Sequence, residues 1–257
     1  MSLLEIKGLT KNFGGLTAVS NVNLKIEKNE LIGLIGPNGA GKTTFFNLLT
    51  GVYEPSEGSI TLTVDEETHE LGGKKTHEIG GLGIGRTFQN IRLFKELSVL
   101  DNVLIAMHGQ RKANLFDTFF RTPNFYESEQ EMKDRALELL ELFNLHKSFS
   151  HKANNLPYGA QRKLEIVRAL ATNPKILFLD EPAAGMNASE SNELTRLIDQ
   201  VHSQYDLAIV LIEHDMNVIM NSAERIFVLE YGKKIAEGTP SEIQKNDHVI
   251  RAYLGGD

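Results

Sequence analysis

The sequence predicts an α/β fold built on a parallel sheet, with an antiparallel β part near the N-terminus and a helical insertion. Two apolar runs, KILFLD (175–180) and LAIVLIE (207–213), have the unbroken hydrophobicity of strands buried on both faces of a parallel sheet. A helical pattern at 189–204 lies between them, as the crossover between parallel strands requires. From about residue 93 to residue 171, apolar residues recur instead at helical spacing.

The N-terminal part has the pattern of short strands separated by turns that contain glycine or asparagine. The expected strands are 3–9, 21–27, 31–36 and 58–64. A helix is expected from Lys42 to Gly51. The polar stretch Asp65–Gly80 is expected to be a loop or an insertion at a strand edge.

Helices are expected at 99–108 and 131–145, on either side of a phenylalanine-rich segment. Further on, Asn187 or Ser189 is the expected cap of the crossover helix, and residues 225–240 have the pattern of a hairpin followed by a short helix. We expect a single domain over the whole chain. Its parts are an α/β core with the β subdomain (1–92 and 172–257) and a helical subdomain (93–171).

Composition narrows the classes of function. The chain has 257 residues, of which 41% are hydrophobic and 24% charged, and its net charge of −7 argues against nucleic acid as the main partner. It has no cysteine, which excludes disulfides and thiolate-bound zinc. We see no secretory signal and no apolar run long enough to span a bilayer, so any membrane role is expected to work through a partner.

A glycine-rich phosphate loop, GPNGAGKTT, stands between an expected strand and an expected helix. Gly36, Gly39 and Gly41 allow the backbone to curl so that successive N–H groups face phosphate oxygens. Lys42 adds a positive charge, and the Thr43 hydroxyl is a candidate ligand of Mg²⁺. The residues expected to bind phosphate are Gly36, Pro37, Asn38, Gly39, Ala40, Gly41, Lys42, Thr43 and Thr44.

Two carboxylates, Asp180 and Glu181, follow the apolar run at 175–180. Ligands of open parallel sheets bind at the carboxyl ends of strands, so Asp180 is placed to act through Mg²⁺ and its waters. Glu181, expected on the opposite side of the pleat, can polarise an attacking water. The alternative is that the pair caps a helix or carries surface charge.

A second helix start, LPYGAQ (156–161), precedes an amphipathic pattern. A glycine at the start of a helix allows bare backbone N–H groups to face an anion. The chain therefore has two candidate anion-binding elements far apart in sequence.

These motifs, together with IVLIEHD at 209–215, resemble the ATPase subunits of ABC transporters over essentially the whole chain. The resemblance implies a P-loop NTPase with a RecA-like core, and a pair of ATPase subunits that enclose two ATP molecules head to tail. The phosphate loop of each subunit would face the signature helix of the other, so LPYGAQ would serve the partner's nucleotide. The signature residues by this resemblance are Pro157, Tyr158, Gly159, Ala160 and Gln161.

The resemblance also implies several roles. Phe13 matches the aromatic residue that stacks on adenine, although a core phenylalanine is the alternative. Gln89 matches the glutamine that reaches Mg²⁺ and the attacking water, and His214 matches the histidine that contacts the γ-phosphate. The stretch Ala183–Asn187 matches the loop that crosses between subunits. By the same resemblance, the magnesium site comprises Thr43, Gln89 and Asp180, and the catalytic residues are Glu181, His214 and Gln89.

Finer features are similar to one ATPase subunit of branched-chain amino acid importers. They include GRTFQNIRLF (85–94), DEPAAGMN (180–187) and AYLGG near the C-terminus. The resemblance implies a second ATPase subunit, permease subunits, an external solute-binding protein and no nucleic acid. It also implies a peripheral place on the cytoplasmic face of the inner or plasma membrane, with a permease helix docking near Phe88–Phe94 and Phe116–Phe120.

Other functions stay open at this point. Importers of urea or short amides and lipid-exporting ABC systems share many of these features. A member of the family that acts on DNA or the ribosome would usually carry a coiled-coil insertion or two cassettes, and neither is seen. A soluble P-loop kinase would not explain LPYGAQ or the glutamate after Asp180.

The signature departs from the usual Leu-Ser-Gly-Gly-Gln, since Pro157 stands at the serine position. Proline cannot donate the serine hydroxyl, and a hydrogen bond to a charged group contributes roughly 1.5–3 kcal/mol. We therefore expect Pro157→Ser to raise the ATPase rate of the assembled transporter. Steady-state phosphate release measures this rate, and no gain would contradict the expectation.

Overall fold

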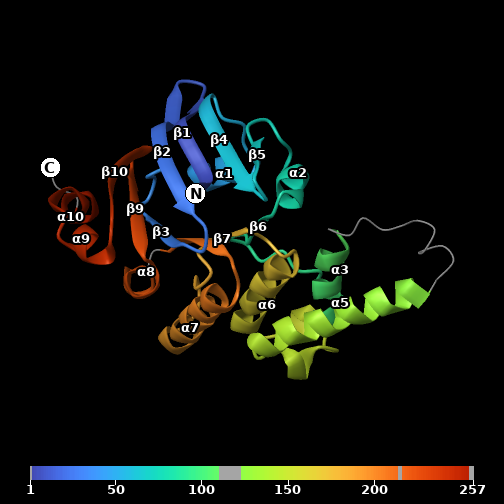
Figure 1. Ribbon diagram of the computed structural model, residues 1–257. Coiled ribbons are helices and arrows are strands. Elements are labelled where there is room, and N and C mark those ends of the chain that lie inside the picture. The colour runs from blue at the N-terminus through green and yellow to red at the C-terminus, as the bar shows by residue number, and fades with distance from the viewer. Residues whose placement is uncertain (1, 110–122, 214–215, 255–257) are drawn as a thin grey trace.

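The computed structural model describes residues 2–109, 123–213 and 216–254. Its larger sheet has six strands in the order β10-β9-β3-β8-β7-β6 (Figure 1). The strands are β3 (Leu31–Ile35), β6 (Ile84–Arg86), β7 (Ile176–Asp180), β8 (Ala208–Ile212), β9 (Arg225–Glu230) and β10 (Lys233–Gly238). All neighbouring pairs are parallel except β10 with β9, which form an antiparallel hairpin. The predicted parallel sheet and C-terminal hairpin are thus confirmed.

A second, antiparallel sheet has the order β2-β1-β4-β5. Its strands are β1 (Ser2–Phe13), β2 (Leu16–Glu27), β4 (Glu57–Val64) and β5 (Glu67–Glu70). The stretch Asp65–Gly80, expected to be a loop or an insertion at a strand edge, contains the edge strand β5 and most of α2 (Thr76–Gly81). β5 is a polar edge strand, and an edge strand that buries neither face lacks the alternating hydrophobic pattern on which the prediction depended.

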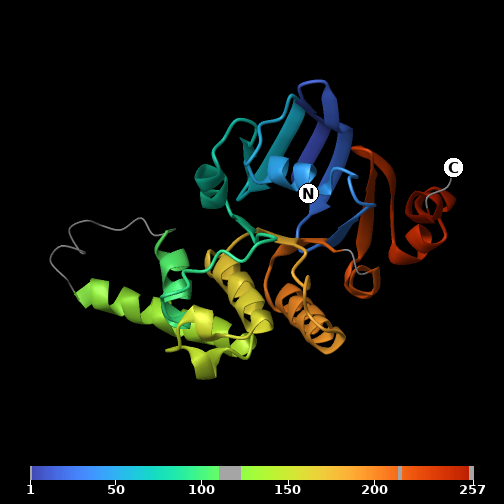
Figure 2. The same ribbon diagram turned by 180° about the vertical axis from the view of Figure 1, so that it is seen from behind.

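The helices gather on the far side of the larger sheet from the antiparallel sheet, apart from α1, α2, α9 and α10 (Figures 1 and 2). They are α1 (Lys42–Leu49), α3 (Val99–His108), α5 (Pro123–Leu142), α6 (Tyr158–Ala171), α7 (Ala188–Gln204), α8 (Met216–Ser222), α9 (Pro240–Gln244) and α10 (Asp247–Leu254). The helices α3, α5 and α6 pack on one another. The boundaries of the helical subdomain, at residues 93 and 171, stay a prediction. Asn187 is the cap of α7, because its side chain accepts the Glu190 N–H at 3.0 Å.

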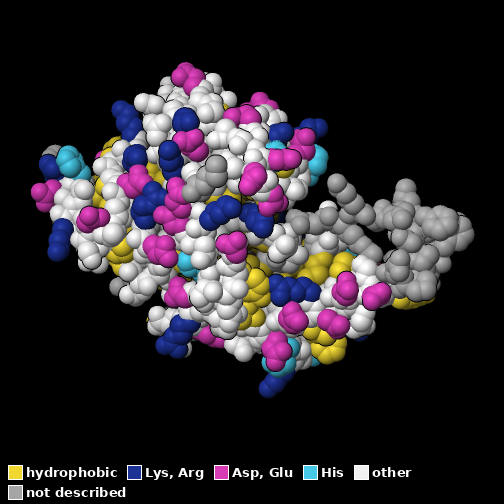
Figure 3. Space-filling view, viewed as in Figure 1, with side chains coloured by type: hydrophobic (Ala, Val, Ile, Leu, Met, Phe, Trp, Pro, Cys, Tyr) yellow, Lys and Arg dark blue, Asp and Glu magenta, His cyan; other side chains and the backbone are white. Residues whose placement is uncertain are grey.

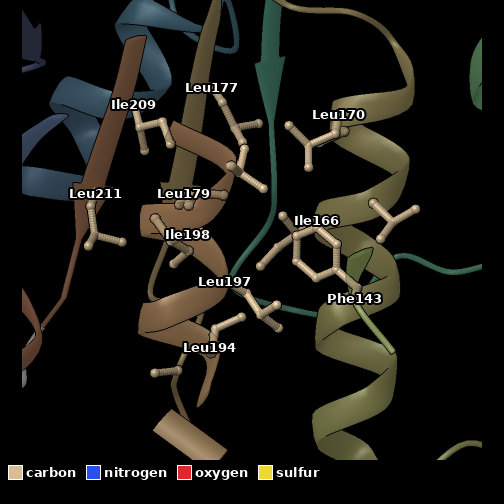
Figure 4. Packing of buried hydrophobic residues seen from close by; sticks show 14 of the residues in the cluster. Phe143, Ile166, Leu170, Leu177, Leu179, Leu194, Leu197, Ile198, Ile209 and Leu211 are labelled. Carbon is tan, nitrogen blue, oxygen red and sulfur yellow. The ribbon is translucent and has the colours of Figure 1, made fainter. Parts of the chain in front are cut away.

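The larger sheet separates two hydrophobic cores, and this explains its unbroken apolar strands. Leu177 and Leu179 of β7 point into the core that α6 and α7 cover (Figure 4). Ile176 and Phe178 point into the other core, which lies toward α1 and the antiparallel sheet. There the Phe178 ring meets Phe46 of α1 edge to face, with 5.1 Å between ring centroids. The strands β3, β7 and β8 are therefore buried along their whole length, as the apolar runs predict for β7 and β8.

The surface carries charges of both signs. On the face shown in Figure 3, acidic and basic side chains are interspersed, and exposed hydrophobic side chains are most evident over the helices α3, α5 and α6. Within the described residues, no helix combines the length and the hydrophobicity needed to cross a bilayer.

Candidate functional site

The glycine-rich loop connects the end of β3 to the start of α1 and forms one wall of a cavity of about 560 Å³. The cavity is lined by Leu16, Thr17, Ala18, Asn38, Gly39, Ala40, Gly41, Lys42, Thr43, Thr44, Glu181, Tyr231 and Gly232. α1 begins at Lys42, so its free N–H groups and its dipole face this space. The arrangement is that of an anion-binding site.

Lys42 is buried, and its ammonium group fixes the loop that precedes it. Its Nζ donates to the carbonyl oxygens of Gly36, at 2.6 Å, and Pro37, at 3.1 Å. Burial lowers the pKa of Lys42 from its usual value, while the carboxylates of Glu181 and Asp180 oppose that shift. A phosphate group entering the cavity would favour the charged form of Lys42 in the same way.

Asp180 and Glu181 lie at the end of β7, but their placement differs from a continued pleat. The strand ends at Asp180, which is buried and whose N–H donates to the Thr87 hydroxyl at 3.2 Å. Glu181 adopts a left-handed backbone conformation with φ of 48°, and its N–H donates to the Ile212 carbonyl at 2.9 Å. This turn, rather than the pleat, directs Glu181 to the cavity wall.

Gln89 reaches the same place from the loop after β6. Its Nε2 donates to Glu181 Oε2 at 3.3 Å. The phosphate loop, Asp180, Glu181 and Gln89 therefore come from segments far apart in the sequence and converge at one edge of the sheet. His214, the remaining expected group, lies outside the described residues.

Comparison with known proteins agrees with this geometry. A family model described as ABC transporter matches residues 19–184, which is more than half of the chain. The chain belongs to the ABC transporter family. A second model, described as branched-chain amino acid ATP-binding cassette transporter, matches residues 233–257.

Individual relatives extend this result to the full length. The high-affinity branched-chain amino acid transport ATP-binding protein LivG of Salmonella typhimurium is 49% identical over 253 residues, or 98% of each chain. The structure of the ADP conformation of MJ1267, an ATP-binding cassette of an ABC transporter, superposes with a TM-score of 0.84 at 30% identity, covering 99% of each chain. The dimeric post-hydrolysis state of the cassette MJ0796, bound to ADP and Pi, gives a TM-score of 0.76 at 27% identity, covering 92% of this chain and 98% of that chain. The fold is that of an ABC-type ATPase.

The residues predicted to form the signature, 157–161, do not line the cavity. Pro157 is the N-cap of α6, and the helix begins at Tyr158. Pro157 and Tyr158 are exposed, Gly159 is buried, and Ala160 is half-buried. Gln161 turns back and donates from Nε2 to the Leu156 carbonyl at 2.9 Å. Within one chain, the second anion-facing helix start thus stays apart from the first.

Phe13 ends β1 and pairs in register with Leu16, which lines the cavity. It is 42% exposed, so the alternative of a core phenylalanine is wrong. Its ring meets Tyr53 edge to face at 5.2 Å. An exposed ring beside the cavity is compatible with the predicted stacking on adenine, which stays a prediction.

The donor groups fit a magnesium ion held largely by a nucleotide. Thr43 lines the cavity, and the buried Asp180 carboxylate lies close enough to the Lys42 ammonium to influence its pKa. Among the described residues, there is no cluster of three or more acidic, histidine or cysteine side chains arranged to hold a metal. Mg²⁺ typically uses one or two protein oxygens together with phosphates and waters, so this sparse set suits it.

Sequence reasoning missed several groups at the site. Tyr231 and Gly232, in the turn between β9 and β10, line the cavity, and the Gly232 N–H donates to the Ala40 carbonyl at 2.9 Å. Glu213 is buried and accepts the Ala183 N–H at 2.7 Å, which fixes the start of the segment 183–187 that is predicted to cross between subunits. The acidic residue at the end of an apolar strand could have revealed Glu213, whereas no local pattern marks the hairpin.

Gly36 offers a test of the loop geometry. Its φ is 153°, and a Cβ added there would lie 2.1 Å from the Leu229 carbonyl oxygen. We expect Gly36→Ala to lower the free energy of unfolding by about 1–3 kcal/mol or more and to weaken ATP binding. Urea unfolding and binding of a fluorescent ATP analogue measure the two effects.

Gly80→Ala is the matched control, because a Cβ at position 80 meets no atom within 4 Å. It should leave both properties near those of the wild type. Equal behaviour of the two variants would contradict the role assigned to Gly36.

Proposed function

We propose that this chain is the ATPase subunit of an importer of branched-chain amino acids. Support comes from 49% identity to LivG over nearly the whole chain and from the C-terminal match to a branched-chain amino acid transporter model. Importers of urea or short amides and lipid-exporting ABC systems are the alternatives. Family membership and the α6 start argue against a soluble kinase.

One observation carries the mechanism: the two anion-facing helix starts do not meet within one chain. The start of α1 faces the cavity, whereas the start of α6 lies outside it, with Pro157 and Tyr158 exposed and Gly159 buried. Two ATPase subunits arranged head to tail would bring each α6 start to the nucleotide of the other subunit. The homologous cassette MJ0796 is dimeric in its ADP- and Pi-bound structure.

We infer the following roles for the chain's own residues. Phe13 holds adenine, and residues 36–44 hold the phosphates. Thr43 and Asp180 would hold Mg²⁺, which neutralises charge on the phosphates when bound. The Glu181 carboxylate, 3.3 Å from the Gln89 amide, orients water for in-line attack on the γ-phosphate. The assignment of His214 to the γ-phosphate rests on the family resemblance.

A groove beside the Gln89 segment suits the permease. It has a volume of about 480 Å³ and lies between the helical part and the core. Its lining includes Arg86, Phe88, Arg92, Phe94, Ile105, Glu165 and Arg168. Three guanidinium groups outnumber one carboxylate here, so an occupant with apolar and acidic side chains is favoured. We propose that a cytoplasmic helix of a permease subunit docks in this groove, and through the transporter the chain would serve an external solute-binding protein.

The proposed roles place the protein at the cytoplasmic face of the inner or plasma membrane, held there by the permeases. The other candidate docking segment, Phe116–Phe120, lies outside the described residues. The groove itself is adjacent to Gln89 along the chain. Phe88 lines the groove, and the next residue, Gln89, is hydrogen-bonded to Glu181. A movement of the docked helix would therefore displace Phe88 and Gln89 and change the position of Glu181.

Glu181→Gln tests the catalytic assignment and the sandwich together. The amide retains the shape of the side chain but is a poor base, so we expect ATP hydrolysis to fall by at least about 100-fold while ATP still binds. Light scattering with ATP and with ADP then reports whether a closed pair accumulates.

A dimer with ATP alone would indicate that the chain can complete the site of an identical partner. A monomer with bound ATP would indicate that the natural partner is a different ATPase subunit. Hydrolysis within about tenfold of the wild-type rate would contradict the role of Glu181.

Phe94→Ala tests the docking groove. Phe94 is 46% exposed, and its backbone is held by Asn102, so truncation should remove contact area without moving the chain. We expect co-purification with the permeases to fall by about tenfold or more. The control is Phe149→Ala, a phenylalanine that is 43% exposed but does not line the groove. Equal loss in both variants, or no loss in Phe94→Ala, would refute the proposed docking site.

A further inference from the structure

A buried arginine joins the start of α6 to the Gln89 segment. Arg162 is only 4% exposed, and its guanidinium donates in three directions. Nη1 donates to the Phe88 carbonyl at 3.0 Å and Nη2 to the Gln89 carbonyl at 2.6 Å. Nε donates to the Tyr158 hydroxyl at 3.1 Å. One side chain therefore holds two segments that are far apart in the sequence.

Glu165 completes this buried cluster. It is 5% exposed, lies 3.5 Å from Arg162 Nη1, and accepts the Arg92 N–H at 3.3 Å. Residues 158, 162 and 165 are spaced four and three apart, so they lie on one face of α6. Burial raises the pKa of Glu165, while its hydrogen bond from Arg92 and the charge of Arg162 oppose the shift. Residues 88–92 are thus held against α6 at both ends.

Tyr158 extends the cluster to a third segment. Gly185, in the crossing loop 183–187, has a φ of 79° and lies directly against the Tyr158 ring. A Cβ added at position 185 would lie 3.1 Å from Tyr158 Cε1, which is tighter than an ordinary contact. The usual signature has glycine where this chain has Tyr158, and glycine would supply neither the ring nor the hydroxyl.

We propose that Tyr158 and Arg162 are positioning residues that couple the Gln89 segment to the signature start and to the crossing loop. The Gln89 segment would serve the chain's own nucleotide, whereas the other two would serve the partner's. The coupling follows from burial: moving the Gln89 segment away from α6 would leave a buried guanidinium without its carbonyl acceptors, which is costly. The three segments therefore move together. This inference rests on the proposed ATP sandwich.

A double-mutant cycle on the assembled transporter tests the coupling. Tyr158→Phe retains the ring against Gly185 and removes only the acceptor for Arg162, and Gln89→Asn shortens the amide that reaches Glu181. We expect each single variant to lower kcat for ATP hydrolysis by about tenfold, with KM for ATP changed by less than about twofold. If the residues act as one unit, the double variant should be about fivefold to tenfold faster than the product of the two single effects predicts.

Tyr205→Phe is the matched control, because this tyrosine lies at the end of α7 and contacts Arg135 rather than the cluster. In the double variant Tyr205→Phe with Gln89→Asn, the fold-loss of kcat should equal the product of the two single fold-losses. If the effects of Tyr158→Phe and Gln89→Asn also multiply, or if Tyr158→Phe leaves kcat unchanged, the coupling is refuted.

ATP affinity of the isolated variants checks that each one folds, and Arg162→Lys provides a second variant of the same cluster. A lysine cannot reproduce the planar fork of donors, so its kcat should fall as that of Tyr158→Phe does. If the wild-type complex did not hydrolyse ATP, the proposed function would be contradicted. If the wild-type complex hydrolysed ATP but the effects of Tyr158→Phe and Gln89→Asn on kcat were independent, only the coupling would be contradicted.

Discussion

The parallel register of the central strands determines where every group of the nucleotide site can lie. Ile212 of β8 stands beside both Leu34 of β3 and Asp180 of β7, so the three strands end at the same level. The phosphate loop, the Asp180–Glu181 turn and the buried Glu213 all follow from these ends. If one strand slipped by one residue, each of its side chains would turn to the opposite face of the sheet and so into the other hydrophobic core. The same slip would move the phosphate loop away from the carboxylates.

Neutral backbone carbonyls, more than opposite charges, hold the buried cations in place. Lys42 donates to the carbonyls of residues 36 and 37, and Arg162 donates to those of residues 88 and 89. A carbonyl satisfies the donor without cancelling the charge. Lys42 therefore fixes the shape of the phosphate loop and still presents its positive charge to a phosphate group. Arg162 likewise holds the loop at residues 88 and 89 by hydrogen bonds to backbone carbonyls and keeps its own positive charge.

The parts that the sequence predicted are those encoded by neighbouring residues. The glycine-rich loop, the apolar strands and the Asp180–Glu181 pair each carry a local pattern, and the convergence of Glu181 with Gln89 follows once the strand order is known. The interactions of Arg162, and the approach of Tyr158 to Gly185, depend on how α6 packs against distant loops. No periodicity in the sequence encodes such contacts. The polar edge strand β5 was missed for a related reason, because pairing with β4 rather than burial defines it.

The hairpin contact to the phosphate loop has a consequence for the order in which the molecule can be completed during synthesis. The phosphate loop is made early, but β3 lies between β8 and β9, which are made much later. The bond from the Gly232 N–H to the Ala40 carbonyl forms later still. Segments that are distant in the sequence must come together before contacts between them can stabilise the fold. A nascent chain on the ribosome therefore lacks a finished nucleotide pocket until almost all of the chain has emerged. Nucleotide can therefore stabilise the finished subunit. It cannot guide the early steps of folding, because the pocket that binds it has not yet formed.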